Sequence, residues 1–380
     1  MLIGIDASRA LRSLRTGTER YSLEIIRHML RLEQAQHHTW RLYTDVPTPN
    51  DTFLVSGIEQ PPAIEIRTLP ACRIWTHRAL ANEVLRNRPN ILFIPAHVLP
   101  FVLPARRLPP SVVSVHDLGH RRFPAAYSRT QWIYLELSTR WAVRAAVRLI
   151  AVSHATGRDL ERLYHAPAAQ IQVVHEATLP FSAPTAGEVA AVQALLGLER
   201  PYALYIGTLQ PRKNLARLID SYSRLHEKSL TSFDLVLAGR AGRHSDELHS
   251  RVRQLGLESR IHFTGYIPEE HLAPLLHAAL MFCYPSLFEG FGLPILEAHY
   301  AGVPVLTANN SSLPEVAGDA ALLVDPTDID AIADAMLRLS QDDALRQRLI
   351  AAGYENVKRF SWEKAAQETL AVLESAAGQG

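Results

Sequence analysis

The chain has 380 residues, of which 47% are hydrophobic and 20% charged, and its net charge is +1. This composition is that of a globular protein, and the length allows two α/β domains, each with its own core. Two cysteines, Cys72 and Cys283, are too few for a disulfide framework or a metal cluster, so we expect a reducing, cytoplasmic environment. The opening residues MLIGIDAS favour a strand over a signal peptide, and no apolar run approaches membrane-spanning length.

The charge is divided unevenly along the chain. Residues 1–180 contain 22 Arg, no Lys and 14 Asp and Glu, a net charge of +8, so residues 181–380 carry −7. A basic half could face anionic lipid at the inner face of the membrane, or an anionic acceptor. The simpler alternative is that the chain prefers Arg and that these charges are dispersed over the surface. We expect no nucleic-acid partner.

The first half alternates short apolar runs with segments of helical spacing, which predicts a parallel α/β sheet. Strands are predicted at residues 2–5, 40–43, 64–68, 91–95, 111–115, 149–152 and 171–175, and helices at 19–32, 74–85 and 130–147. The loop over residues 7–18 follows the first strand, at the edge where such sheets bind ligands. Its single glycine, Gly17, would let the backbone approach a ligand.

His116 follows a continuous apolar run, residues 111–115, that is typical of a central parallel strand. At the carboxyl end of such a strand, a side chain points toward the ligand crevice. The alternative is a structural histidine bonded to a carboxylate or to the backbone, and the position favours the functional interpretation. His120 and His154 lack this support and are interpreted as structural or peripheral.

A second series of strands and helices begins at Ala203, after a proline-containing stretch, residues 179–200, that is predicted to be a hinge. Gly207 ends the first strand, and Arg212 and Lys213 lie before the next helix. Two adjacent cations in such a loop suit a diphosphate, because Arg offers a planar fork and Lys a point charge; a solvated turn is the alternative. Arg240 and Tyr266 follow two further strands.

The stretch from Cys283 to Val305 contains two carboxylates, Glu289 and Glu297, separated by Gly-Phe-Gly-Leu-Pro. The pattern predicts Glu289 in a glycine loop after a strand, Pro294 at the first helical position and Glu297 in the first helical turn. The free N–H groups of that helix would favour a phosphate, and Glu297 could accept hydrogen bonds from sugar hydroxyls. The alternative is a strand–turn–helix unit whose carboxylate only complements the helix dipole.

Asp328-Ile329-Asp330 is a D-x-D sequence, a pattern that holds a metal–nucleotide complex in some transferases. Here it follows Pro326 and precedes a predicted helix over residues 331–339. Asp328 is therefore better explained as an N-cap residue, and no metal site is predicted.

The stretch PSLFEGFGLPILEA, followed by AGVPVL, resembles the signature of the retaining glycosyltransferases of family 4. The resemblance covers nearly the whole chain and is strongest at residues 203–216 and 283–306. It implies the GT-B fold: two facing Rossmann-like α/β domains with parallel sheets and an active site in the cleft between them. The implied parts are an acceptor-side domain (1–178), a hinge (179–200), a donor domain (201–359) and a helix returning to the first domain (360–380).

The resemblance also implies roles for individual residues. His116 and Glu289 would be catalytic, with His116 contacting the transferred sugar. The residues implied in donor binding are Gly17, Gly207, Arg212, Lys213, Arg240, Tyr266, Gly290, Phe291, Gly292, Leu293 and Glu297. The chain departs from the family in having one glycine near residue 17, where two are usual, and Glu176-Ala177 where Asn-Gly is common.

The implied reaction transfers a hexose from a nucleotide diphosphate sugar to a hydroxyl of a glycan or lipid-linked acceptor in polysaccharide biosynthesis. Retention is expected, without a metal ion or other cofactor. Stretches near His116 and Arg240 look closest to mannosyltransferases, so GDP-mannose is the first donor expected; UDP-glucose or a deoxysugar such as rhamnose is the alternative. An epimerase of the same fold and a non-catalytic sugar-nucleotide-binding protein are more remote. A nicotinamide dehydrogenase is excluded, since no G-x-G-x-x-G follows a strand.

Overall fold

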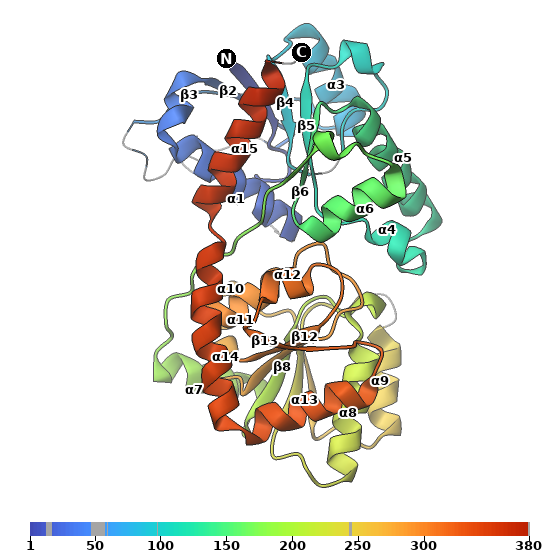
Figure 1. Ribbon diagram of the computed structural model, residues 1–380, viewed down its shortest axis with the longest axis vertical. Helices are drawn as coiled ribbons and strands as arrows, with labels where there is room; N and C mark the ends of the chain where they lie inside the picture. The colour runs from blue at the N-terminus through green and yellow to red at the C-terminus, as the bar shows by residue number, and fades with distance from the viewer. Residues whose placement is uncertain (13–16, 47–57, 59, 97, 243–244, 379–380) are drawn as a thin grey trace. The chain divides into compact units, whose positions relative to one another are not determined.

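The computed structural model describes residues 1–12, 17–46, 58, 60–96, 98–242 and 245–378. These residues form two compact α/β units (Figure 1). Unit 1 comprises Met1–Ala177 and Phe360–Gly380, and unit 2 comprises Thr178–Arg359. Among the described residues, no helix is both long enough and apolar enough to span a bilayer.

Unit 1 is built on a seven-stranded parallel sheet in the order β3-β2-β1-β4-β5-β6-β7. The first strand lies inside the sheet, and the order reverses between β1 and β4, as in a doubly wound fold. The strands are β1 (Leu2–Asp6), β2 (Thr39–Thr44), β3 (Ala63–Thr68), β4 (Ile91–Ile94), β5 (Ser111–Val115), β6 (Arg148–Ala151) and β7 (Ile171–Val173).

The helices of unit 1 connect these strands, as parallel pairing requires. They are α1 (Gly17–Arg31), α3 (Ala81–Arg86), α4 (Gly119–Arg122), α5 (Arg129–Ala145), α6 (His154–Tyr164) and α15 (Trp362–Ala377). Short 3-10 turns lie at Glu33–His37, Ala105–Arg107, Pro124–Ala126 and Ala168–Gln170. Part of the 7–18 loop, residues 13–16, lies outside the described residues.

Helix α15 follows unit 2 in the chain but packs in unit 1 beside α1 (Figure 1). It begins at Ser361, whose side chain accepts a hydrogen bond from the Lys364 backbone N–H. Trp362 is buried, with its ring centroid 5.8 Å from that of Tyr21 on α1. Leu373 on the same face is fully buried, so this helix is part of the core of unit 1.

The predicted helix over residues 74–85 begins later and less regularly than its apolar spacing indicated. Ile74 has φ +68°, a left-handed conformation that is a clear outlier for a β-branched residue. A π-helical turn, Thr76–Leu80, follows it, and only Ala81–Arg86 forms α-helix. The periodicity was therefore interrupted by a local backbone conformation that side-chain spacing does not encode.

Unit 2 is built on a six-stranded parallel sheet in the order β10-β9-β8-β11-β12-β13. Its first strand again lies inside the sheet, and the order reverses between β8 and β11. The strands are β8 (Tyr202–Ile206), β9 (Asp234–Ala238), β10 (Ile261–Gly265), β11 (Met281–Tyr284), β12 (Val305–Ala308) and β13 (Ala321–Val324). Every residue of β9, β11 and β12 is buried, which explains their continuous apolar sequences.

The helices of unit 2 are α7 (Ala186–Leu196), α8 (Leu215–Glu227), α9 (Ser245–Gln254), α10 (Glu269–His277), α11 (Leu293–Tyr300), α12 (Leu313–Ala317), α13 (Ile329–Gln341) and α14 (Asp343–Asn356). Short 3-10 turns lie at Pro211–Lys213 and Val357–Arg359. Helix α7 lies within the stretch predicted as a hinge, so much of that stretch is regular structure. A capping box between Thr185 and Glu188 starts it, a signal that the proline count obscured.

The two parallel sheets confirm the predicted fold class of two Rossmann-like α/β units. Asp328 caps α13, as predicted, and accepts a hydrogen bond from the Ala331 backbone N–H at 3.0 Å. Asp330 pairs with Arg224 on α8. Both carboxylates of the D-x-D sequence therefore have structural partners.

Candidate active site

Unit 2 places Arg212 and Lys213 in a 3-10 turn, Pro211–Lys213, at the carboxyl edge of its sheet. Asn214 ends the turn in the left-handed conformation, with φ +64°. Its buried side-chain amide donates to the carbonyls of Pro285 (3.0 Å) and Pro326 (2.6 Å). Asn214 thus fixes the turn against the loops that follow β11 and β13.

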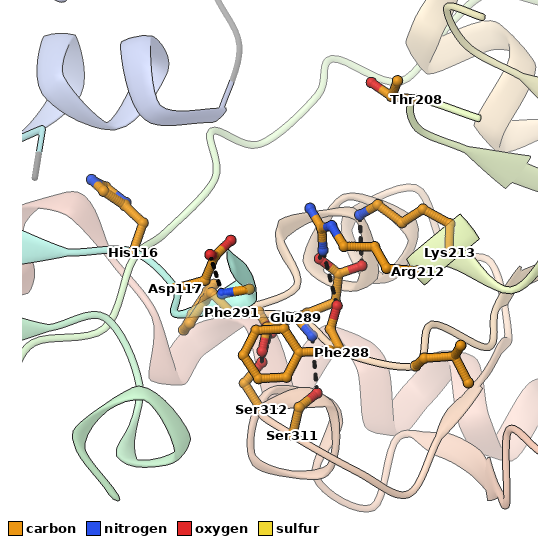
Figure 2. A network of polar contacts seen from close by, with 12 residues as sticks. His116, Asp117, Thr208, Arg212, Lys213, Phe288, Glu289, Phe291, Ser311 and Ser312 are labelled. Carbon is orange, nitrogen blue, oxygen red and sulfur yellow. Dashed lines mark hydrogen bonds and ion pairs between the residues drawn. The ribbon is translucent and has the colours of Figure 1, made fainter. Parts of the chain in front are cut away.

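The two cations converge on one carboxylate, that of Glu289. Figure 2 shows Arg212 and Lys213 reaching it from the same side. Arg212 Nη1 donates to Glu289 Oε2 at 2.7 Å and to the Phe288 carbonyl at 2.9 Å. Lys213 Nζ donates to Glu289 Oε1 at 2.6 Å and to the Tyr284 hydroxyl, also at 2.6 Å. Each carboxylate oxygen is therefore bound by a different cation.

The network of Arg212, Lys213 and Glu289 is buried and carries a net charge of +1. Lys213 is 7% exposed and Glu289 6%. Burial alone would raise the pKa of the Glu289 carboxyl, but the charges and hydrogen bonds of Arg212 and Lys213 lower it to about 2. Glu289 is consequently a carboxylate at neutral pH that holds both cations.

The loop that carries Glu289 is fastened by residues that follow β12. The Glu289 backbone N–H donates to Ser311 Oγ at 3.1 Å. The Ser312 hydroxyl bonds to the carbonyl oxygens of Glu289 (3.0 Å) and Phe291 (2.5 Å). These contacts lie beside Glu289 in Figure 2. The sequence reasoning missed both serines, although an Asn-Ser-Ser run after a predicted strand is a turn signal that could have indicated them.

The end of this loop forms the start of α11. Gly290 and Phe291 are buried, and Gly292 has φ +124°, a conformation that favours glycine. Helix α11 begins at Leu293, one residue earlier than predicted, with Pro294 in its first turn. Glu297 therefore lies in the second turn, not the first, and is buried at 8% exposure.

Gly207 and Arg240 lie in the loops that follow β8 and β9. A Cβ atom on Gly239 would stand 2.0 Å from the Gly207 carbonyl oxygen, so the two backbones touch. The Arg240 guanidinium lies over the ring of Tyr266, with its carbon 4.5 Å from the ring centroid. The structure thus pairs two of the predicted donor-binding residues, and Tyr266 is 57% exposed at that edge.

His116 lies in unit 1, after β5, and both of its ring nitrogens have partners. Nδ1–H donates to Glu176 Oε1 and Nε2–H donates to the Pro95 carbonyl, each at 2.8 Å. Burial alone would lower the pKa of this imidazole, but the Glu176 carboxylate and the Pro95 carbonyl raise it. From the sequence, Glu176 was only a departure from the family pattern. The structure makes it the hydrogen-bond partner of His116.

Gly17, the other predicted residue of unit 1, is the first residue of α1. A Cβ atom added there would meet no atom of the described residues within 4 Å, so the described structure gives no steric reason for a glycine. Of the predicted residues, unit 2 brings together Arg212, Lys213, Glu289 and the loop into α11, whereas Gly17 and His116 belong to unit 1.

Both halves of the chain match glycosyltransferase families. Residues 15–177 match the family described as Glycosyltransferase Family 4, and residues 191–356 match Glycosyl transferases group 1. The O-antigen chain mannosyltransferase B of Escherichia coli is 32% identical over 384 residues, covering 96% of this chain and 98% of the relative. This chain is a family 4 glycosyltransferase.

The fold of this glycosyltransferase is that of solved GT-B structures. The sucrose-phosphate synthase of Thermosynechococcus elongatus superposes with a TM-score of 0.74 at 19% identity, over 100% of both chains. HepE of Anabaena, solved with UDP and glucose, gives a TM-score of 0.70 at 20% identity, covering 98% of this chain and 99% of HepE. The GT-B prediction is confirmed.

Proposed function

We propose that this glycosyltransferase moves a hexose from a nucleotide diphosphate sugar to a hydroxyl group of a glycan or lipid-linked acceptor, in the biosynthesis of a polysaccharide. The observation that carries the proposal is the buried network of Arg212, Lys213 and Glu289 at the carboxyl edge of the unit 2 sheet. Its two adjacent cations suit a diphosphate, and parallel α/β sheets bind ligands at this edge.

The chemistry explains why two cations would be needed. Departure of a nucleoside diphosphate builds negative charge on its phosphate oxygens, and one positioned donor is worth roughly 3 kcal/mol in such a transition state. Arg212 and Lys213 would supply this charge without a metal ion. Glu289, ionised at neutral pH, would hold both cations and accept hydrogen bonds from the sugar.

We further propose that the anomeric configuration is retained. In the reaction that the family implies, the acceptor hydroxyl attacks the face from which the diphosphate leaves. The new bond joins the acceptor oxygen to the anomeric carbon, the bond to the diphosphate breaks, and the departing phosphate takes the acceptor's proton. His116 would support the transferred sugar.

Mannose from GDP-mannose is the first donor proposed. The full-length similarity to an O-antigen chain mannosyltransferase supports it. UDP-glucose is the alternative, because HepE, which shares the fold, was solved with UDP and glucose; a deoxysugar such as rhamnose is a third choice.

The donor can be tested by thermal unfolding in the presence of GDP-, UDP-, dTDP- and ADP-sugars. A ligand at 100-fold its Kd stabilises the folded state by about 2.7 kcal/mol, so the correct nucleotide should raise Tm clearly above the others. Transfer of labelled mannose from GDP-mannose to an α-mannoside should follow. Stabilisation by UDP-glucose alone would replace the mannose proposal, and no response to any sugar nucleotide would contradict donor binding.

Peripheral contact with an anionic membrane, at its cytoplasmic face, is also proposed. Unit 1 contains 23 Arg and Lys against 17 Asp and Glu, a net charge of +6. On α5, Ile133 and Leu137 are about half exposed and lie one turn apart, with Arg129 and Arg140 on neighbouring turns. An exposed apolar stripe flanked by Arg favours a lipid surface with negative charge.

Flotation with vesicles of anionic or neutral lipid, at low and physiological salt, tests this contact. Binding should require anionic lipid, weaken with salt and fall in Ile133→Ser/Leu137→Ser. The matched control is Leu195→Ser on α7 in unit 2, a position that is also exposed. Absence of binding to both kinds of vesicle would remove membrane contact from the proposal.

A further inference from the structure

Unit 1 contains a cavity of about 520 Å³ at the carboxyl edge of its sheet. Its lining comes from segments that follow three adjacent strands: Ser8 and Arg9 after β1, Asp45 after β2 and Trp75 after β3. This volume lies in the range of about 300–1,000 Å³ that small-molecule sites occupy, and this edge is where parallel sheets bind ligands.

The charges of the described lining residues are balanced. Arg12 Nη2 pairs with Asp45 Oδ2 at 2.7 Å, and Arg9 Nη1 pairs with Glu19 Oε1, also at 2.7 Å. Both arginines are about half exposed, whereas the side chains of Asp45 and Glu19 are 14% and 9% exposed. Two cations are thus matched by two deeper carboxylates, which favours a neutral polar ligand over an anion.

Two residues of the lining each keep a buried polar atom without a hydrogen-bond partner among the described residues. These atoms are Trp75 Nε1, an obligate donor, and Asp45 Oδ1, an acceptor. Trp75 is 7% exposed, so its N–H has been removed from water without compensation. A sugar hydroxyl both accepts and donates, so sugar hydroxyls can pair with an atom of either kind.

The backbone before Trp75 supports the same interpretation. Ile74 holds a left-handed conformation, which persists only where the surrounding structure fixes it, and such strain gathers at ligand sites. The π-helical turn Thr76–Leu80 follows at once, and turns of this kind are frequent at functional sites. Trp75 lies between these two irregular features, and its side chain lines the cavity.

We infer that this cavity binds a neutral sugar ring of the acceptor, with Trp75 donating to one hydroxyl and Asp45 accepting from another. The inference rests on the proposed function, which assigns the donor to unit 2 and leaves the acceptor to a second site. It identifies the acceptor's binding end as a carbohydrate, not as a lipid phosphate.

The test uses the indole N–H resonances of the five tryptophans in the full-length protein, without any donor. The Trp75 resonance is assigned by its loss in Trp75→Phe. Methyl α-D-mannopyranoside and α-linked mannobiose, at tens of millimolar, should shift it saturably, whereas inorganic phosphate should not. The chemical shift of the Trp141 N–H should not change, because this N–H already donates to the Pro100 carbonyl at 3.0 Å.

A second measurement separates ligand binding from a structural role. Trp75→Phe loses buried surface but no satisfied hydrogen bond, so Tm should fall less than in Trp141→Phe, while the sugar affinity falls several-fold. Trp141→Phe, the matched control, breaks a satisfied hydrogen bond, so Tm should fall while sugar binding is kept. Asp45→Asn should weaken sugar binding as well.

Two NMR results would overturn the inference: no shift of the Trp75 resonance with either sugar, or a shift with phosphate alone. A Trp75→Phe variant with a lower Tm but an unchanged affinity for the sugar would overturn it as well. Because these measurements need no donor, they are independent of the proposed transfer. A sugar that binds at Trp75 while no sugar nucleotide is turned over would contradict the proposed function instead.

Discussion

At the scale of single residues, the site depends on Glu289, a buried carboxylate with a cation on each oxygen. Removing one member of a buried ionic network costs about 3–5 kcal/mol, because the remaining charges lose their compensation. Glu289 also fixes the positions of Arg212 and Lys213, so its loss should disturb donor binding as well as turnover. The catalytic role expected for Glu289 is therefore coupled to the positions of both cations.

We predict that Glu289→Gln destabilises the protein by about 3–5 kcal/mol at neutral pH, because Arg212 and Lys213 lose the negative charge that they share. The pKa of Glu289 is lowered in the folded state, so its stabilising effect is present above the unfolded pKa near 4.5 and is lost as pH falls toward 2. Urea unfolding from pH 7 to pH 2 should show the difference between wild type and variant shrinking over that window. Asp330→Asn, which breaks an exposed pair, is the control, and a pH-independent difference would contradict the prediction.

His116 is the second residue whose protonation is set by a neighbour. When both ring nitrogens donate, the imidazole is charged, and the raised pKa reflects this. The stabilising effect of the His116–Glu176 pair is then complete below about pH 6.5 and is lost as pH rises through the folded-state pKa.

We predict that Glu176→Gln lowers the pKa of His116 and moves the basic limb of kcat/KM to lower pH. The reason is that the glutamine amide keeps a hydrogen bond but removes the charge that favours the imidazolium. NMR titration of the His116 ring protons measures the first effect, and pH–rate profiles measure the second. Glu161→Gln, on an exposed part of α6, is the control, and a His116 titration that does not change would contradict the assignment.

At the scale of elements, the loops after β8 and β9 are held together by two glycines whose backbones touch. Gly207 has φ +151° and Gly239 has φ +145°, and a side chain on Gly239 would collide with the Gly207 carbonyl. This contact sets the start of the segments that lead to Arg212 and Arg240. A substitution at either glycine should therefore displace the loops at the carboxyl edge of the unit 2 sheet.

We predict that Gly239→Ala destabilises unit 2 by about 1–3 kcal/mol more than Gly256→Ala. Both positions have positive φ, so both substitutions carry the backbone penalty, but a Cβ atom on Gly256 would meet nothing within 4 Å. Thermal and urea unfolding measure the difference. Equal effects of the two substitutions would show that the loops separate easily.

The elements also show what the sequence could and could not predict. Buried parallel strands are continuous apolar runs, so the prediction placed each strand of unit 1 within a residue or two. The network of Arg212 and Glu289 joins residues 77 positions apart, and no local pattern encodes such a contact. Asn214 and Ser312 were missed for the same reason. Their side chains bind backbone carbonyls of distant loops, and these partners cannot be predicted from the neighbouring sequence. The left-handed conformation of Ile74 could not be predicted either, because the surrounding structure fixes it.

At the scale of the whole molecule, the proposed reaction takes its positive charge from side chains. Asp328 caps a helix and Asp330 pairs with Arg224, so both carboxylates of the D-x-D sequence have structural roles. Arg212 and Lys213 stand where the leaving diphosphate would bind in the proposed reaction.

We predict that transfer needs no divalent cation and retains the anomeric configuration. Activity should survive exhaustive chelation, and NMR of the first product formed should show the configuration of the donor. A matched reaction with added Mg²⁺ or Mn²⁺ controls for weakly bound ions. Loss of activity on chelation with recovery on adding either ion would contradict the metal-free mechanism, and an inverted product would contradict retention.

The chain leaves unit 1 after Ala177 and re-enters it at Phe360, so unit 1 is assembled from two separated segments. On the ribosome, residues 1–177 emerge long before α15, whereas unit 2 is complete once Arg359 has emerged. Domains fold as units during synthesis, so unit 2 can finish first although its sequence comes second. Until Trp362 and Leu373 arrive, unit 1 has an uncovered apolar face at α1, a surface that a chaperone would recognise.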